Sequence, residues 1–254
     1  MAPSLKRKKI RAFLILFWSV VVIWMFFQMQ ASGFDESVLE SDSLVDVENT
    51  SEFIRFFPKA SKAFDSSTIV VFYPGALVQA EAYTPFARKL AENGYPVIIQ
   101  KIPFRLAFTK GMEKSVFDET LTLINSYPDT LNWVLAGHSK GGAMASEFAG
   151  IYPKKLSGLL LIGTSHPRRV DLSNLKIPVT KVHASEDGLA SMEEVKEFSV
   201  NLPNQTNFVL VNGGNHSQFG YYGFQFGSGS ATISREEQQQ QLLNASHELL
   251  LNLN

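Results

Sequence analysis

Short, almost wholly apolar runs alternate with segments of helical period from residue 68 to the end of the chain, and this alternation limits the possible folds most strongly. The run TIVVFY at residues 68–73, for example, is β-branched and aromatic and ends at Pro74-Gly75, as a buried strand does. The pattern predicts strands at residues 68–73, 96–102, 133–136, 156–162, 179–184 and 208–211, and helices at 79–93, 113–127, 140–151, 191–198 and 234–251.

The continuously apolar character of these runs predicts how the strands are arranged. Strands that are buried on both faces and separated by helices form a parallel sheet that helices cover on both sides. We therefore expect an α/β fold with a mostly parallel central sheet. Catalytic and binding groups of such sheets collect at the edge where the carboxyl ends of the strands meet, so candidate site residues should follow the predicted strands directly.

The overall composition excludes several classes of function. Of the 254 residues, 45% are hydrophobic and 19% are charged, which is a balance typical of globular proteins. The formal net charge of −1 gives no reason to expect a nucleic-acid partner. The chain has no cysteine, which excludes a thiol nucleophile, a disulfide bond and a thiolate metal site.

The N-terminus has the pattern of a membrane segment. A basic cluster, KRKKIR at residues 6–11, precedes an apolar run from Ala12 to Phe27, which approaches the roughly 20 residues of a spanning helix. The positive-inside rule places the basic end in the cytoplasm. We therefore expect residues 1–31 to be an uncleaved transmembrane signal anchor, giving a single-pass protein of the cell membrane with its domain extracytoplasmic. Cleavage after Ala31 is the alternative.

Residues 32–52 differ in composition from the segments on either side. They carry several Asp and Glu, no Lys or Arg, and few side chains that could build a core. Such a composition is typical of a solvated spacer. We therefore expect a flexible acidic stalk at 32–52 and one folded domain at 53–254.

The segment GHSKG at residues 137–141 matches G-x-S-x-G and lies between a predicted strand and a predicted helix. That context predicts a nucleophile elbow, in which a sharp turn exposes Ser139 at the start of a helix. Gly137 and Gly141 are required because a Cβ at either position would collide with the neighbouring strand or helix. The helix dipole at Ser139 favours negative charge that develops on a substrate.

A serine nucleophile needs a base and an acid that orients the base. In this kind of fold the order along the chain is Ser, then Asp or Glu, then His. Asp187 and His216 each follow the end of a predicted strand, whereas His166 precedes Asp187. We therefore predict Asp187 as the acid and His216 as the base; a simple helix-start role is the alternative for Asp187.

Two backbone N–H groups are needed to stabilise the oxyanion. We predict the N–H of Lys140, the residue after the nucleophile, and the N–H of Ala76 in the loop after the first strong strand, in preference to that of Leu77. Six aromatic residues are candidates either for an acyl or alcohol pocket or for simple loop packing: Phe104, Phe108, Phe219, Tyr221, Tyr222 and Phe224.

From about residue 53 to the C-terminus, the sequence resembles the α/β-hydrolase superfamily, and specifically a bacterial branch called α/β-hydrolase fold-5. The resemblance implies a Ser-Asp-His triad that maps onto Ser139, Asp187 and His216, and it implies no particular substrate. The motifs that carry it are FYPG at 72–75, GHSKGG at 137–142, DGL at 187–189, GGNHSQFG at 213–220 and ATISREEQ at 231–238.

These features favour one function and leave an alternative. We expect a membrane-anchored, esterase-like serine hydrolase that acts on a small acyl substrate through an acyl-enzyme on Ser139, without a metal or organic cofactor. The alternative is a non-catalytic hydrolase-fold protein that binds a ligand in the cell envelope. A complete triad argues against that alternative, because a binding protein needs none of its three members.

Overall fold

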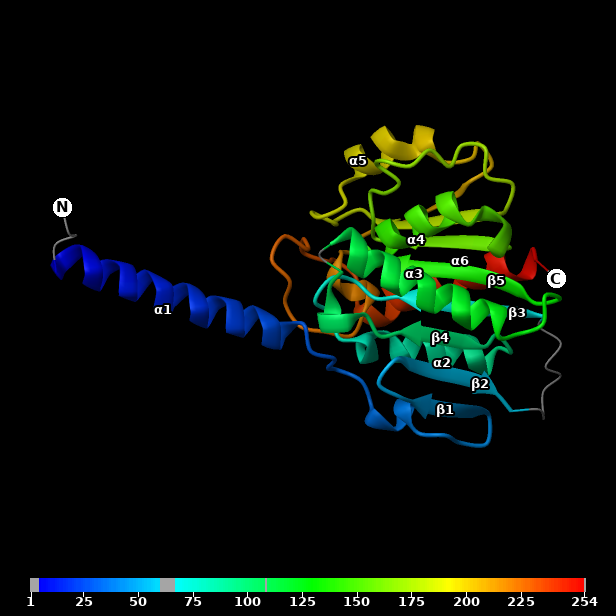
Figure 1. Ribbon diagram of the computed structural model, residues 1–254, viewed down its shortest axis with the longest axis horizontal. Coiled ribbons are helices and arrows are strands. Elements are labelled where there is room, and N and C mark those ends of the chain that lie inside the picture. Colours follow the sequence, from blue (N-terminus) through cyan, green and yellow to red (C-terminus); the bar gives the residue numbers. More distant parts are fainter. Residues whose placement is uncertain (1–4, 60–66, 108, 254) are drawn as a thin grey trace.

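One sheet organises the computed structural model, which describes residues 5–59, 67–107 and 109–253 (Figure 1). Within these residues, eight strands are hydrogen-bonded in the order β1-β2-β4-β3-β5-β6-β7-β8. Neighbours from β4 to β8 run parallel, whereas β1 with β2 and β2 with β4 run antiparallel. The strands are β1 (Val45–Asn49), β2 (Phe53–Pro58), β3 (Thr68–Tyr73), β4 (Val97–Gln100), β5 (Asn132–His138), β6 (Gly158–Ile162), β7 (Val179–Ala184) and β8 (Asn207–Val211).

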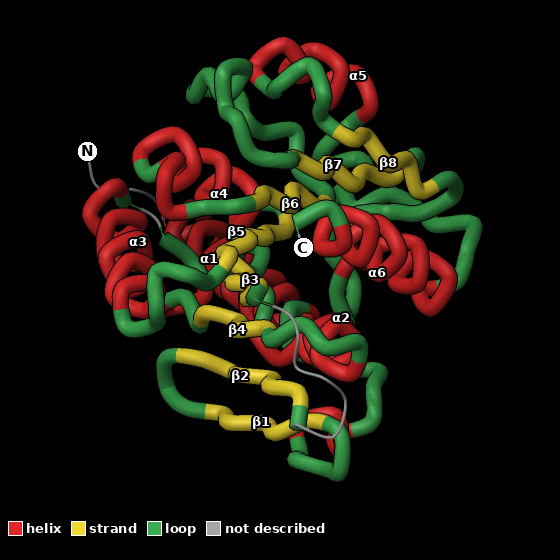
Figure 2. The backbone as a smooth tube through the Cα atoms, turned by 90° about the vertical axis from the view of Figure 1, so that its right-hand side faces the viewer, coloured by secondary structure: helices red, strands yellow, loops and turns green. Residues whose placement is uncertain are grey.

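Helices cover both faces of the sheet, which confirms the α/β fold predicted from the sequence. Figure 2 shows α2 and α6 on one side of the sheet and α3 and α4 on the other. The short helix α5 lies near β7 and β8. The helices are α1 (Leu5–Gln28), α2 (Thr84–Glu92), α3 (Lys110–Asn125), α4 (Lys140–Ile151), α5 (Met192–Glu197) and α6 (Arg235–Leu251).

Strand β3 shows why the apolar runs predict this arrangement. Val70 and Phe72 belong to the core cluster beneath α2 and α6, while Ile69 and Val71 belong to the cluster beneath α3 and α4. Successive side chains of a strand point to opposite faces, so a strand covered on both faces needs apolar residues throughout. Burial of each such side chain stabilises the fold by about 1.5–3 kcal/mol relative to exposure.

The segment expected to be a flexible acidic stalk is instead folded against the domain. Its strand β1 pairs with β2, which places Val45 fully inside the core with 0% exposure. Arg88 of α2 binds the backbone carbonyls of Ser37 and Val38 and forms an ion pair with Asp42. The acidic composition misled the prediction because the partners that hold the segment, strand β2 and Arg88, lie outside it, and a local count of charges does not reveal them.

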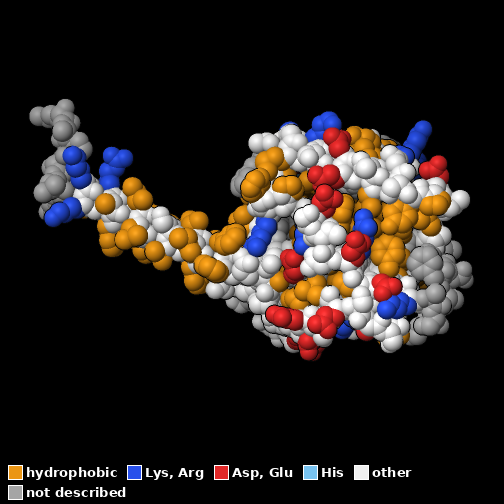
Figure 3. All heavy atoms as spheres, turned by 60° about the horizontal axis from the view of Figure 1, so that its bottom comes forward, with side chains coloured by type: hydrophobic (Ala, Val, Ile, Leu, Met, Phe, Trp, Pro, Cys, Tyr) orange, Lys and Arg blue, Asp and Glu red, His pale blue; other side chains and the backbone are white. Residues whose placement is uncertain are grey.

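Helix α1 projects away from the domain as a single rod (Figure 1). Its Arg7–Gln28 portion, 22 residues, is long and apolar enough to cross a membrane, and none of the residues in its most apolar stretch is buried. Figure 3 shows apolar side chains along the rod and Lys and Arg side chains at its far end. The core begins immediately after it, because Met29 is only 3% exposed.

Candidate active site

Ser139 occupies a strained turn between β5 and α4. Its φ of 54° and ψ of −117° are a backbone conformation that residues other than glycine rarely adopt. The Ser139 N–H donates to the carbonyl oxygen of Ile162 in β6, at 2.9 Å, which ties the turn to the sheet. A Cβ on Gly137 would collide with the backbone of Gly141, and a Cβ on Gly141 with the carbonyl oxygen of Tyr73. The two glycines therefore permit the tight strand–turn–helix geometry that the sequence predicts.

Asp187 and His216 lie side by side beyond the ends of β7 and β8. His216 Nδ1 is 2.8 Å from Asp187 Oδ2, and the two residues are 1% and 4% exposed, respectively. The other carboxylate oxygen, Oδ1, accepts hydrogen bonds from the N–H groups of Leu189 and Ala190, both at 2.8 Å. A carboxylate oxygen can only accept a hydrogen bond, so the tautomer of His216 that fits this contact carries its proton on Nδ1 and leaves Nε2 as an acceptor.

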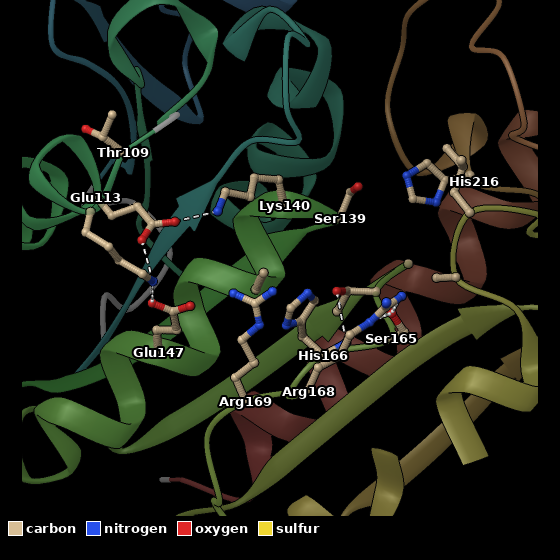
Figure 4. A pocket seen from close by; sticks show the side chains of 16 residues that line it. Thr109, Glu113, Ser139, Lys140, Glu147, Ser165, His166, Arg168, Arg169 and His216 are labelled. Carbon is tan, nitrogen blue, oxygen red and sulfur yellow. Dashed lines mark hydrogen bonds and ion pairs between the residues drawn. The ribbon is translucent and has the colours of Figure 1, made fainter. Parts of the chain in front are cut away.

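Ser139 and His216 line the same cavity, whose volume is about 490 Å³. Figure 4 shows the Ser139 hydroxyl and the His216 ring at one side of this cavity, with the ring turned toward the serine. His216 Nε2 is buried and has no hydrogen-bond partner among the described residues. A buried ring nitrogen without a partner is unusual, and it is available to accept a proton.

The loop after β3 holds the other predicted oxyanion donor. Gly75 donates its N–H to the Tyr83 hydroxyl at 3.0 Å, and Leu77 donates its N–H to the Arg105 carbonyl at 2.6 Å. Between them, the Ala76 N–H has no acceptor among the described residues. The free Ala76 N–H is a better candidate for the oxyanion donor than the Leu77 N–H, which is already bonded. However, Ala76 is not among the residues that line the cavity at Ser139. Its role, like that of the Lys140 N–H, stays a prediction.

A buried pair that the sequence did not reveal supports the elbow and the loop after β3. The Tyr83 hydroxyl accepts from the Gly75 N–H and shares a hydrogen bond of 2.8 Å with His138 Nδ1, so it joins the loop after β3 to the elbow. Complete burial, together with the nearby His216, holds the pKa of His138 well below its ordinary value. The His138 and His216 rings are 4.6 Å apart, so His138 gives His216 an uncharged neighbour.

Charged side chains form the other walls of the cavity (Figure 4). Lys140 forms an ion pair with Glu113, and Arg168 forms one with Glu194 and binds Ser165. Arg169 has no ion pair among the described residues, so it adds an unbalanced positive charge to the rim. The cavity is therefore polar on this side, and it carries a cation within reach of a bound substrate.

His166 also lines the cavity, but it makes no contact with Asp187. Burial, with a smaller contribution from Arg168, lowers the pKa of His166 to about 4. Its carbonyl oxygen accepts from the Lys181 ammonium, and burial lowers the pKa of Lys181 to about 7. The structure thus places His216, and not His166, within hydrogen-bond distance of Asp187.

None of the described aromatic residues considered for an acyl pocket lines this cavity. Phe219 and Tyr222 are buried in the core, and Tyr221 packs against Phe34. Phe104 and Phe224 are exposed to solvent, and Phe108 lies outside the described residues. Loop packing, the alternative considered from the sequence, accounts for the buried members but not for the exposed ones. Among the described residues, no group of three or more His, Asp or Glu could hold a metal ion.

The sheet order and the strand–turn–helix elbow define the fold class as that of the α/β hydrolases. A sequence model described as the alpha/beta hydrolase family matches residues 69–240, and the chain belongs to this family. The family resemblance inferred from the sequence motifs is therefore confirmed. No curated protein matches the chain by sequence.

Solved structures of several hydrolases share the fold. Est1E from Butyrivibrio proteoclasticus superposes with a TM-score of 0.57 and 14% identity over 82% of this chain and 100% of that one. A soluble variant of monoglyceride lipase from Saccharomyces cerevisiae, in complex with a substrate analogue, has a TM-score of 0.62 and 10% identity, over 85% of this chain and 97% of that one. Ferulic acid esterase from Streptomyces cinnamoneus has a TM-score of 0.58 and 16% identity, over 74% of this chain and 67% of that one. At these identities the similarity establishes the fold alone.

Proposed function

We propose that this protein is a serine hydrolase that cleaves acyl esters through an acyl-enzyme on Ser139. The observation that supports this most strongly is the buried Asp187–His216 hydrogen bond beside a cavity that Ser139 also lines. The structural neighbours named as esterases or as a lipase favour an ester over other acyl bonds. In this proposal Ser139 is the nucleophile, His216 the base and Asp187 the orienting acid.

The proposed reaction has two halves. In the first half, Ser139 Oγ attacks the ester carbonyl carbon as its proton passes to His216 Nε2, and the tetrahedral intermediate then expels the alcohol, which takes that proton. In the second half, water gives a proton to Nε2 and attacks the acyl carbon, and the acid leaves as Ser139 regains its hydrogen. Asp187 stabilises the imidazolium in both halves without taking up the proton.

The negative charge of each tetrahedral intermediate needs donors that are already in place. The N–H of Lys140 lies in the first turn of α4, where the helix dipole favours an anion. We assign the second donor to the Ala76 N–H, because the flanking N–H groups are already bonded. Loss of one such donor costs a typical enzyme about 10²–10³ in kcat.

We expect the full-length protein in detergent to react covalently with a fluorophosphonate and to hydrolyse p-nitrophenyl acetate. The reason is that an activated serine attacks both electrophiles, whereas a hydrolase-fold binding protein attacks neither. Intact-mass spectrometry and peptide mapping would locate the adduct, which should lie on Ser139. An unreacted protein that is folded by circular dichroism would favour the non-catalytic binding function instead.

We also propose that α1 anchors the protein in the cell membrane with the catalytic domain outside. Basic residues at the start of Arg7–Gln28 support this orientation, and the burial of Met29 and the pairing of Ala31 with Tyr222 support retention of the segment. Protease added to intact cells should therefore remove the domain, as measured by immunoblotting. Complete protection would contradict the orientation, and release of a shortened soluble protein would indicate cleavage.

A further inference from the structure

Helix α1 continues into the domain without a spacer, and its end is bound by domain loops. The N–H groups of Gly223 and Phe224 donate to the carbonyl and side-chain oxygens of Gln28, at 2.8 and 2.9 Å. The Gln79 N–H donates to the Met29 carbonyl at 3.0 Å, and the Ser32 N–H to the Tyr221 carbonyl at 2.9 Å. These bonds fix the domain relative to the helix end, so the orientation of one determines that of the other.

All the loops that bind the helix end lie at the catalytic edge of the sheet. Gln79 follows β3, Arg105 follows β4, and residues 221–224 follow β8. Arg105 donates to the side-chain oxygen of Gln30 at 3.1 Å. Ser139 follows β5 and Asp187 follows β7. Because these five strands are parallel, their carboxyl ends share one edge. Figure 1 shows α1 leaving the domain beside the loop after β8.

Large aromatic side chains are exposed on the same loops. Phe104 is 85% exposed, Phe226 76% and Phe224 53%. Phe104 has a φ of 54°, a strained value that surrounding contacts must maintain. We call these three residues the aromatic patch. Phenylalanines on a membrane-facing surface can insert into the boundary between headgroups and acyl chains, which removes their apolar area from water.

The aromatic patch is continuous with the aromatic end of α1. The ring of Phe224 lies 5.9 Å from that of Trp24, and the guanidinium of Arg105, next to Phe104, lies 4.8 Å from the ring of Phe26. The span Arg7–Gln28 has 22 residues and a length of about 33 Å at 1.5 Å per residue, close to the roughly 30 Å of the hydrocarbon layer. A helix that crosses the bilayer therefore ends at the headgroups, where the patch begins.

We propose that the catalytic edge of the domain lies against the outer surface of the bilayer, with the aromatic patch inserted among the lipid headgroups, and that Ser139 acts on acyl esters of membrane-resident amphiphiles. The bilayer is the occupant of the patch because α1, whose Trp24 and Phe26 lie against Phe224 and Arg105, is long and apolar enough to cross a membrane. The substrate part of this proposal rests on the proposed hydrolase function, whereas the orientation part rests on contacts alone.

The orientation can be measured without any activity. The chain has no cysteine, so single cysteines can carry a fluorophore at chosen positions in the full-length protein. We compare Phe226→Cys and Phe104→Cys with Val200→Cys, a 75% exposed apolar position between α5 and β8. In phosphatidylcholine vesicles that contain doxyl-labelled lipid, bimane at 226 and 104 should be quenched and bimane at 200 should not.

Two results would overturn the orientation. Bimane at positions 226 and 104 would be as little quenched by doxyl lipid as bimane at 200, in protein shown to be folded and inserted. The second result is that bimane at positions 226 and 104 becomes shielded from water only as the protein-to-lipid ratio rises. A second copy of the chain would then be the occupant of the patch.

A second comparison tests the substrate class. The double variant Phe104→Ser/Phe226→Ser should hydrolyse a vesicle-borne fluorogenic monoacyl ester about fivefold more slowly, because less apolar area enters the interface. Its turnover of p-nitrophenyl acetate should stay within about twofold of the wild type, as should both activities of the Val200→Ser control. Equal turnover of the vesicle-borne ester by the double variant and the wild type would overturn this part, as would a wild type that hydrolyses only the soluble ester. A wild type that hydrolyses neither ester would contradict the proposed function, and the quenching result would still decide the orientation.

Discussion

Replacement of Ser139 by alanine should abolish fluorophosphonate labelling and lower ester turnover by about 10⁴-fold or more, as removal of a triad serine does in other hydrolases. The reason is stereochemical as well as chemical. Among the described residues, Ser139 alone combines a hydroxyl with the elbow conformation and the start of α4 beside His216. Turnover measured with p-nitrophenyl acetate, together with intact-mass detection of the adduct, would check this result.

Ser165 provides the matched control for that variant. It lines the same cavity, but its hydroxyl binds Arg168 and it lies outside the elbow. Ser165→Ala should keep labelling at Ser139, with turnover that falls far less than in Ser139→Ala. Wild-type turnover by a folded Ser139→Ala protein would contradict the proposed mechanism.

His216→Ala should reduce turnover nearly as much as Ser139→Ala, and Asp187→Asn by about 10⁴-fold, the loss seen in the serine-protease example of the same change. Without His216, Ser139 has no base. With asparagine at 187, the side-chain amide no longer requires a proton on Nδ1, so the tautomer that leaves Nε2 free loses its stabilisation. Single-turnover kinetics on a p-nitrophenyl ester would measure both losses in the acylation step.

Non-additivity provides the sharper test of the triad. Because its members act as a unit, Ser139→Ala/His216→Ala should be little worse than Ser139→Ala alone. The control is His183→Ala, since His183 is buried near Phe208 and does not line the cavity. Its turnover should stay close to that of the wild type once folding is verified by circular dichroism. Losses that multiply in the double variant would mean that Ser139 and His216 act independently.

The local pattern of the sequence predicted the elements of this domain well. The elbow was predicted from the G-x-S-x-G pattern at residues 137–141 and from the apolar strand and the helix on either side of it. The contact that requires Gly137 lies within the same turn, whereas the contact that requires Gly141 is with Tyr73 at the end of β3. Helix α6 begins at Arg235, directly after the predicted start at residue 234, and Ser234 and Glu237 form a capping box there with both hydrogen bonds present. Features that depend on a few successive residues can be predicted because their physical cause lies within those residues.

The first strands of the sheet could not be predicted by the same means. β1 has only two apolar residues, Val45 and Val47, and its pairing partner is a separate strand. β2 then pairs antiparallel with β4, a strand that comes later in the chain than β3. Because the energy of such a strand comes from its neighbours across the sheet, its own sequence carries a weak signal.

The sequence alone determined the α/β class and the strand–turn–helix elbow at Ser139, because strand and helix periods and turn stereochemistry are local properties. Only the tertiary structure decided the rest. It placed Asp187 beside His216, joined Tyr83 to His138 across 55 positions, and bound Phe224 to Gln28 across 196. These contacts unite residues far apart in the chain, and their existence depends on how complete elements pack rather than on any short run of residues.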